Sequence, residues 1–200
     1  MCNELAVKVT SERFNCITKF AFATSVGHQP GNPNKQNQDA YVLVPNMLGQ
    51  LGLHFFSVCD GHGLNGHHVS AYIKEHLPLY IEKQLAQDKL YKSNSRLAEF
   101  YDRIPRQMHN AFLQVHDDLA KVNYDTDLSG STCVAILFDR NTIFSANAGD
   151  SRGVLYSYDR AQSGIKITPL SKDHKPCMPV EKKRVLSVGG RVDTIKGSLG

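Results

Sequence analysis

The 200-residue sequence has no apolar run long enough to cross a bilayer, no C-x-x-C pair and no secretory leader. A membrane span is therefore not expected. The five cysteines are odd in number and widely spaced, which predicts reduced thiols in a cytoplasmic or nuclear protein. Position 2 is Cys2, which excludes N-myristoylation. Internal repeats and low-complexity segments are also missing, and a hydrophobic content of 41% suffices for one substantial core.

Several chemical signatures are absent as well. The sequence contains no G-x-x-x-x-G-K-[ST] loop, no G-x-S-x-G elbow and no kinase catalytic loop. His62, His67 and His68 miss the i, i+4 spacing of a helical zinc site, so zinc is not expected. The net charge of +4 is mild, and the one basic cluster, Lys182 to Arg184, follows Glu181 in an expected helix. Such a cluster is typical of a solvated face, and no nucleic-acid partner is predicted.

The first informative pattern is a predicted β-hairpin. The candidate strands, Ala40 to Leu48 and Leu51 to Cys59, are rich in Val, Leu and Phe, and Gly49-Gln50 would form a two-residue turn. That turn sets a register in which Asp39 faces Asp60. Because like charges directly opposite each other destabilise a sheet, a divalent cation would compensate them. The alternative is that both aspartates are solvent-exposed turn formers at strand ends.

The rest of the chain alternates long helices with antiparallel strands. Apolar residues recur at helical spacing from Val69 to Leu85, where Pro78 is expected to kink or split the helix, and from Ile104 to Val122, where Pro105 suits the first turn. The remaining expected elements are the strand pairs Thr132 to Phe138 with Ile143 to Ala148 and Gly153 to Tyr158 with Ile165 to Leu170, and a helix from Pro179 to Val188. This order predicts an α+β fold and argues against a doubly wound parallel sheet.

The residues after the first hairpin combine an acid, a glycine and an imidazole. The Gly61 carbonyl could bind the same cation as Asp60, because Mg²⁺ and Mn²⁺ prefer oxygen ligands. A water between two such ions would attack a phosphorus centre, and His62 could protonate the leaving alkoxide. The alternative for His62 is a surface histidine beside a glycine-rich turn. At the second hairpin, pairing Phe138 with Ile143 would place Asp150 level with Ser131.

Five ordered blocks resemble the metal-dependent protein phosphatase family, of the PPM or protein phosphatase 2C type. They are Asn37-Gln38-Asp39, Val58 to Gly63, Gly130 to Thr132, Asn147 to Arg152, and Leu170 to Pro176 followed by Glu181, Arg184, Gly189 and Gly190. Five blocks in the same order are far more specific than any one of them. The resemblance predicts an N-terminal extension over residues 1–19 and a partial phosphatase domain over residues 20–200.

The resemblance implies an antiparallel β-sandwich flanked by helices, in four layers. It also implies hydrolysis of phosphoserine and phosphothreonine in proteins by a water activated between two Mg²⁺ or Mn²⁺ ions, with a third, weaker ion. Asp60 would bridge the two ions, and the Gly61 carbonyl would contact one of them. Asp39 would support the coordinated waters, Asp150 would help to hold the third ion, and His62 matches the family's proton donor.

The chain departs from the family pattern in three ways. Lys35 lies where an arginine often grips the substrate phosphate, and a lysine would act there as a less directional point charge. Gln38 stands where many members carry glutamate, which removes one carboxylate from around the ions and should alter metal affinity more than fold. The later aspartates that complete the family's metal site have no counterpart before Gly200. A domain incomplete at its C-terminus is expected.

Two hypotheses about function follow from the sequence. The first is a phosphatase that acts on a phosphorylated protein substrate as a monomer, without nucleic-acid or membrane partners. The second is a catalytically weak or inactive phosphatase-like binding module, which the missing C-terminal acids would favour. The joint presence of Asp39, Asp60, His62 and Asp150 favours the enzyme, because a scaffold has no use for that set of carboxylates.

Overall fold

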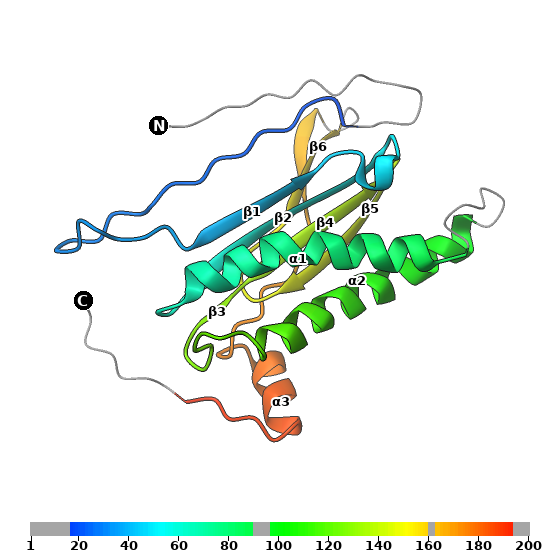
Figure 1. The fold of residues 1–200 in the computed structure, drawn as a ribbon. Coiled ribbons are helices and arrows are strands. Elements are labelled where there is room, and N and C mark those ends of the chain that lie inside the picture. Colours follow the sequence, from blue (N-terminus) through cyan, green and yellow to red (C-terminus); the bar gives the residue numbers. More distant parts are fainter. Residues whose placement is uncertain (1–16, 90–96, 160–162, 194–200) are drawn as a thin grey trace.

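The computed structural model describes residues 17–89, 97–159 and 163–193 (Figure 1). Its elements are β1 (Asp39–Val44), the 3-10 helix η1 (Met47–Gly49), β2 (Leu53–His62), α1 (Gly66–Gln87), α2 (Leu97–Leu119), β3 (Gly130–Ser131), β4 (Cys133–Asp139), β5 (Thr142–Ala148), β6 (Val154–Asp159), β7 (Gly164–Pro169) and α3 (Pro179–Ser187). The order β1-β2-β4-β5 makes up the main antiparallel sheet, and β3 pairs with the end of β2. Strands β6 and β7 form a separate two-stranded sheet.

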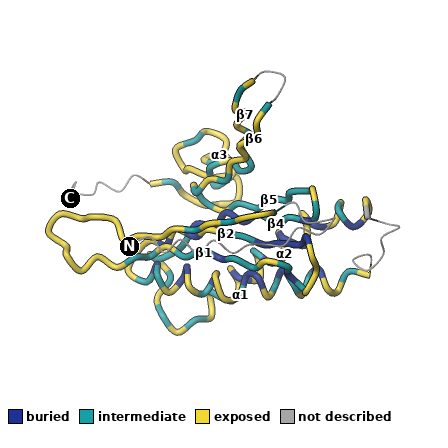
Figure 2. Tube along the Cα trace, turned by 90° about the horizontal axis from the view of Figure 1, so that it is seen from above, coloured by how far each residue is buried: buried dark blue, intermediate teal, exposed yellow. Residues whose placement is uncertain are grey.

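Helices α1 and α2 cover one face of the main sheet, as Figure 2 shows. Alternate residues of β2, including Phe55 and Cys59, are fully buried in the core cluster that these helices complete. The apolar stripe of α2, with Ile104 and Met108 one turn apart, packs into the same cluster. The intervening residues of β2 therefore point to the opposite face, and Asp60 and His62 belong to that set.

The opposite face of the sheet carries the N-terminal segment and the β6–β7 arm, with α3 on the same side (Figure 2). Phe22 stacks on Tyr41 with ring centroids 4.4 Å apart, and Phe20 lies 5.6 Å from Phe56. An apolar hollow of about 390 Å³ remains beside these rings. Val58 is 52% exposed there, so this face is covered only in part by the described residues.

The predicted α+β class with antiparallel sheets is confirmed. Of the four predicted layers, the described residues supply one helix layer and the first sheet, and β6, β7 and α3 lie on the other side. The second predicted hairpin has the expected register, with Phe138 opposite Ile143. Residues 1–16 of the predicted N-terminal extension lie outside the described residues. Of the helices in the described part of the chain, none combines the length and apolarity that a membrane crossing requires.

The predicted two-residue turn of the first hairpin is wrong. Strand β1 ends at Val44 and β2 begins at Leu53, with η1 between them. Asn46 and Leu48 adopt left-handed backbone angles, φ 52° and 57°, and the Asn46 amide donates to His54 Nδ1 at 3.2 Å. The chain therefore leaves the sheet early on both sides. The predicted register, with Asp39 opposite Asp60, is still correct, because the loop includes residues from the ends of both predicted strands.

The structure differs from the expectation at both prolines: α1 is not split at Pro78, and Pro105 is not in the first turn of α2. Helix α1 continues through Pro78. This proline is buried, and so are Leu77 and Ile81 of the same helix, which are each 1% exposed. Their burial outweighs the single hydrogen bond that proline removes. Pro105 lies in the interior of α2, which begins at Leu97, because Phe100 already extends the apolar stripe by one turn.

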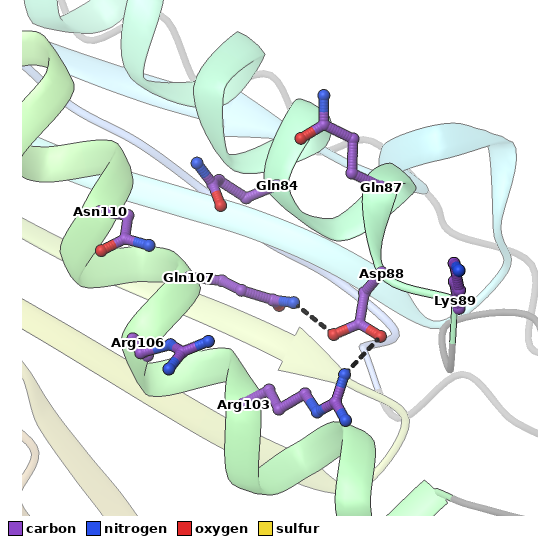
Figure 3. Close-up of a pocket in the computed structure, with 8 residues that line it drawn as sticks. All are labelled: Gln84, Gln87, Asp88, Lys89, Arg103, Arg106, Gln107 and Asn110. Carbon is purple, nitrogen blue, oxygen red and sulfur yellow. Dashed lines mark hydrogen bonds and ion pairs between the residues drawn. The ribbon is translucent and has the colours of Figure 1, made fainter.

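Asp88 connects the end of α1 to α2 beside a polar cavity of about 360 Å³ (Figure 3). Its carboxylate, only 4% exposed, accepts a hydrogen bond from Gln107 Nε2 at 2.7 Å and lies 3.4 Å from Arg103 Nη1. We expect Asp88→Ala to lower the free energy of unfolding by about 2 kcal/mol, because the buried Gln107 amide loses its acceptor. Urea unfolding would measure the loss. Asp102→Ala, at an exposed position of α2, is the control and should have little effect.

Candidate metal and phosphate site

Two carboxylates face each other at the end of the main sheet. Asp39 is the direct cross-strand partner of Asp60, as predicted from the sequence. Partial burial raises the pKa of Asp39, and the charge of Asp60 and a hydrogen bond with it raise this pKa further, whereas Lys35 lowers it. The charge of Asp60 therefore opposes the ionisation of Asp39.

Thr132 fixes the backbone of Asp60 from the neighbouring strand. The Asp60 amide donates to Thr132 Oγ1 at 3.0 Å, and the Thr132 amide donates to the Asp60 carbonyl at 2.9 Å. The hydroxyl of Thr132 also lies 2.6 Å from Ser151 Oγ. These contacts hold the acid at a defined place on the sheet. Neither Thr132 nor Ser151 is predicted from the sequence as an individual site residue.

Gly61 lets three segments meet at the site. A Cβ atom at this position would lie 2.4 Å from the carbonyl oxygens of Gln38 and Gly66, which is far inside van der Waals contact. Only glycine fits between the start of β1 and the start of α1. The close approach explains why a glycine directly follows Asp60.

Asp39 and Asp60, the acid pair, line a cavity of about 350 Å³. Polar residues of the loop before β1 line this cavity together with Asp39, Asp60 and Gly61. Asn37 anchors the loop, because its Nδ2 donates to Thr24 Oγ1 at 2.7 Å and its Oδ1 accepts from the Asp39 amide at 3.1 Å. Lys35 is the one cationic residue among the described residues that line this cavity.

His62 lies at the end of β2, opposite Gly130 of β3. It is two residues from Asp60 on the same strand, so both side chains project from the same face of the sheet. Its ring lies against Gly130, where an added Cβ atom would be 2.9 Å from His62 Nε2. His62 is exposed, and it is not among the residues that line the cavity beside Asp39 and Asp60.

Asp150 is not part of the acid pair. The β4–β5 ladder has the predicted register, but it ends at Cys133 and Ala148, and Ser131 pairs with Gly61 of β2. The Asp150 carboxylate instead lies 3.7 Å from Lys175 Nζ. Residues 17–89, 97–159 and 163–193 contain no group of three or more His, Cys, Asp or Glu side chains able to hold a metal ion.

An ion pair supports the loop that carries Asp150. Arg152 donates through Nε and Nη2 to the two carboxylate oxygens of Asp173, at 2.9 and 2.7 Å. The adjacent guanidinium lowers the pKa of Asp173. The His174 amide also donates to the Gly149 carbonyl at 2.9 Å, so the block from Leu170 to Pro176 buttresses this loop.

The donors of the site suit a hard divalent cation. Two facing carboxylates and the Gly61 carbonyl provide oxygen ligands only, as Mg²⁺ and Mn²⁺ prefer. A cation between the carboxylates would also remove the repulsion that contributes to the raised pKa of Asp39. The described residues therefore fit part of a metal site.

Comparison with known proteins gives consistent matches. The family model described as Protein phosphatase 2C matches residues 24–200. The chain is 31% identical over 195 residues to Probable protein phosphatase 2C 35 of Arabidopsis thaliana, covering 96% of this chain and 51% of that protein. It is 33% identical over 165 residues to Protein phosphatase 1B of Bos taurus, covering 80% of this chain and 32% of that protein. The chain thus spans about half or less of these relatives.

Solved structures show the same fold. A serine-threonine phosphatase 2C from Toxoplasma gondii superposes with a TM-score of 0.65 at 22% identity, covering 94% of this chain and 60% of that chain. A sex determining protein from C. elegans superposes with a TM-score of 0.61 at 20% identity, covering 82% and 38%. At these identities the likeness concerns the fold alone.

Proposed function

The chain belongs to the protein phosphatase 2C family, and from this premise we propose that it contributes to the metal-dependent hydrolysis of phosphoserine and phosphothreonine in proteins. The observation that carries the proposal is the facing pair Asp39 and Asp60 at the mouth of a polar cavity. A carboxylate pair without a cation would weaken the sheet, so its place in the fold has a functional explanation.

Asp60 and the Gly61 carbonyl would hold two Mg²⁺ or Mn²⁺ ions, with Asp39 beside them. The bound ions would supply Lewis-acid chemistry that polarises water and phosphoryl oxygens. Thr132 keeps the Asp60 backbone in register while the carboxylate binds. Asp150 would support a third ion only after its carboxylate leaves Lys175, which makes that site the weakest of the three.

Lys35 and His62 would act on the substrate. Lys35 lines the cavity and carries the positive charge that a phosphomonoester dianion needs. His62 projects from the same face as Asp60 and would donate a proton to the seryl or threonyl alkoxide as it leaves. A neutral alcohol then departs, and inorganic phosphate is the other product.

The test is hydrolysis of a phosphothreonine peptide by the 200-residue chain. We expect turnover in Mn²⁺ and none in EDTA, because the acid pair needs a cation to polarise water. Phosphate release would be measured with Lys35→Met and His62→Gln beside the wild type: loss of Lys35 should raise KM, and loss of His62 should lower kcat. A folded wild-type chain that releases no phosphate in Mn²⁺ would contradict the proposal.

The placement of the predicted site residues favours the enzyme over the binding module without activity. Asp39, Asp60, Gly61 and His62 are gathered at one end of one sheet, where chemistry would need them.

A further inference from the structure

Gln38 binds the connection between β2 and α1 through both its side chain and its backbone. Its Nε2 donates to the Gly63 carbonyl at 2.8 Å. Its carbonyl accepts from the Gly61 amide at 3.2 Å and from Ser70 Oγ at 2.6 Å. One residue, directly before Asp39, therefore holds three points of the segment that contains His62.

The bond to Gly63 requires an amide. A glutamate side chain of the same length is an acceptor only when ionised, and it would place its charge against the Gly63 carbonyl oxygen. The other donor to that oxygen, the Gly66 amide, lies at 3.5 Å, which makes the Gln38 bond the shorter of the two. Gln38 therefore does something that the glutamate of the family pattern could not do.

The position of Gln38 leaves little freedom to this segment. A Cβ atom at Gly66 would lie 2.6 Å from Gln38 Oε1, and one at Gly61 would lie 2.4 Å from the Gln38 carbonyl oxygen. The side chain thus fills the space between the start of β1 and the start of α1. His62 stands between Gly61 and Gly63, and Gln38 bonds to the backbone of both.

We propose that Gln38 is a positioning residue for His62. By bonding to the amide before this histidine and to the carbonyl after it, Gln38 fixes the backbone from which the imidazole projects. The proposal rests on the proton-donating role proposed for His62. In this chain the residue before Asp39 then supports the proton donor, whereas a carboxylate at this position would be available to the metal ions.

The first experiment is amide hydrogen exchange in EDTA, which needs no activity. Gln38→Met keeps the length of the side chain and removes the donor, so exchange should accelerate about fivefold to tenfold at Gly66, whose amide donates to the same Gly63 carbonyl. The control is Gln87→Met, at an exposed position at the other end of α1, which should leave exchange at Gly66 unchanged. Unchanged exchange in Gln38→Met would overturn the proposed clamp, by which we mean the bonds from Gln38 to the backbone of Gly61 and Gly63.

The second experiment is a double-mutant cycle with His62. Gln38→Met should lower kcat in Mn²⁺ about tenfold and leave KM for the phosphopeptide unchanged, because Lys35 is untouched. In a His62→Gln background the same change should have no further effect on kcat. A merely structural role would give independent losses in both backgrounds, and that result would overturn the positioning role.

The two experiments separate the proposals. If the wild type shows no turnover in Mn²⁺ although exchange accelerates in Gln38→Met, the proposed function fails and the catalytic purpose of the clamp fails with it. If the wild type turns over normally and exchange does not change in Gln38→Met, the clamp fails and the proposed function stands.

Discussion

Asp60→Asn is expected to lower Mn²⁺-dependent turnover at least roughly 100-fold and to stabilise the metal-free protein. Asparagine has nearly the shape of aspartate, and the backbone bonds between residue 60 and Thr132 remain. The variant loses the charged group that is proposed to bind the ions, and with it the repulsion of Asp39. Because opposed like charges destabilise a cross-strand pair, the free energy of unfolding should rise by up to about 1 kcal/mol at neutral pH.

Three measurements check this prediction. Isothermal titration with Mn²⁺ and phosphate release would report the functional loss, and urea unfolding in EDTA would report the gain in stability. Asp127→Asn, at an exposed loop position away from the acid pair, serves as the matched control and should change none of the three. A variant that is less stable than the wild type in EDTA would show that Asp60 serves the fold and not a cation.

The pH dependence has a definite sign. Burial, with Asp60 as the next cause, raises the pKa of Asp39 above its ordinary 3.8. A carboxyl whose pKa is raised by folding favours the folded state below its unfolded pKa, and this contribution is lost as pH rises through the folded pKa. In EDTA the difference in stability between Asp60→Asn and the wild type should therefore shrink as the pH falls from neutral towards about 4. Burial of Asp39 acts in both proteins, so the part of the difference that varies comes from Asp60.

The sequence predicts the register of the first hairpin for a physical reason. The predicted register comes from a turn centred between Gly49 and Gln50, and it holds because the observed loop is centred at the same place, with Val44 opposite Phe55; the burial of Phe55 and Cys59 sets only which face of β2 points to the helices. The turn could not be predicted in the same way. Left-handed backbone angles at Asn46 and Leu48 are uncommon for residues other than glycine, and no local pattern announces them.

The helices show where a local rule yields to packing. Proline is costly inside a helix, yet α1 and α2 both contain one, because the residues around Pro78 and Pro105 bury an apolar stripe against the sheet. Burial against a sheet formed by other segments is a tertiary property. A rule based on the proline alone therefore predicts a break that α1 does not have, and it places the start of α2 too late in the sequence.

In the candidate site, too, some features could be predicted from the sequence and others could not. The acid pair and the glycine after it could be predicted, since hairpin register and close backbone approach have local signatures. The supporting hydroxyl groups of Thr132 and Ser70 could not be predicted. Thr132 is 72 residues from Asp60, and Ser70 is 32 residues from Gln38, so their contacts follow no periodicity. Strands β3 and β4 pair with β2 in one continuous register, whereas β5 pairs with β4 only as far as Ala148, so Asp150 lies beyond the last pair of that ladder.

Gly63→Ala is expected to have the largest effect on stability of the changes considered. Gly63 has φ +82°, and a Cβ atom there would lie 2.2 Å from the Leu128 carbonyl oxygen and 2.7 Å from Ser129 Cα. Alanine would therefore pay for a left-handed backbone, at about 1–2 kcal/mol, and would also push the loop before β3 away, at about 1–3 kcal/mol. Together these predict a loss of about 3 kcal/mol in the free energy of unfolding.

Gly189→Ala isolates the cost of the backbone angle. Gly189, at the end of α3, has φ +81°, and an added Cβ atom would meet nothing within 4 Å. It should therefore lose only about 1 kcal/mol. Urea unfolding of both variants compares two equal backbone angles in different surroundings, and equal losses would contradict the role given to the contact with Leu128 and Ser129. A larger loss in Gly63→Ala would show that the β2–α1 turn, which carries His62 and receives the Gln38 bond, is held by packing against the loop before β3.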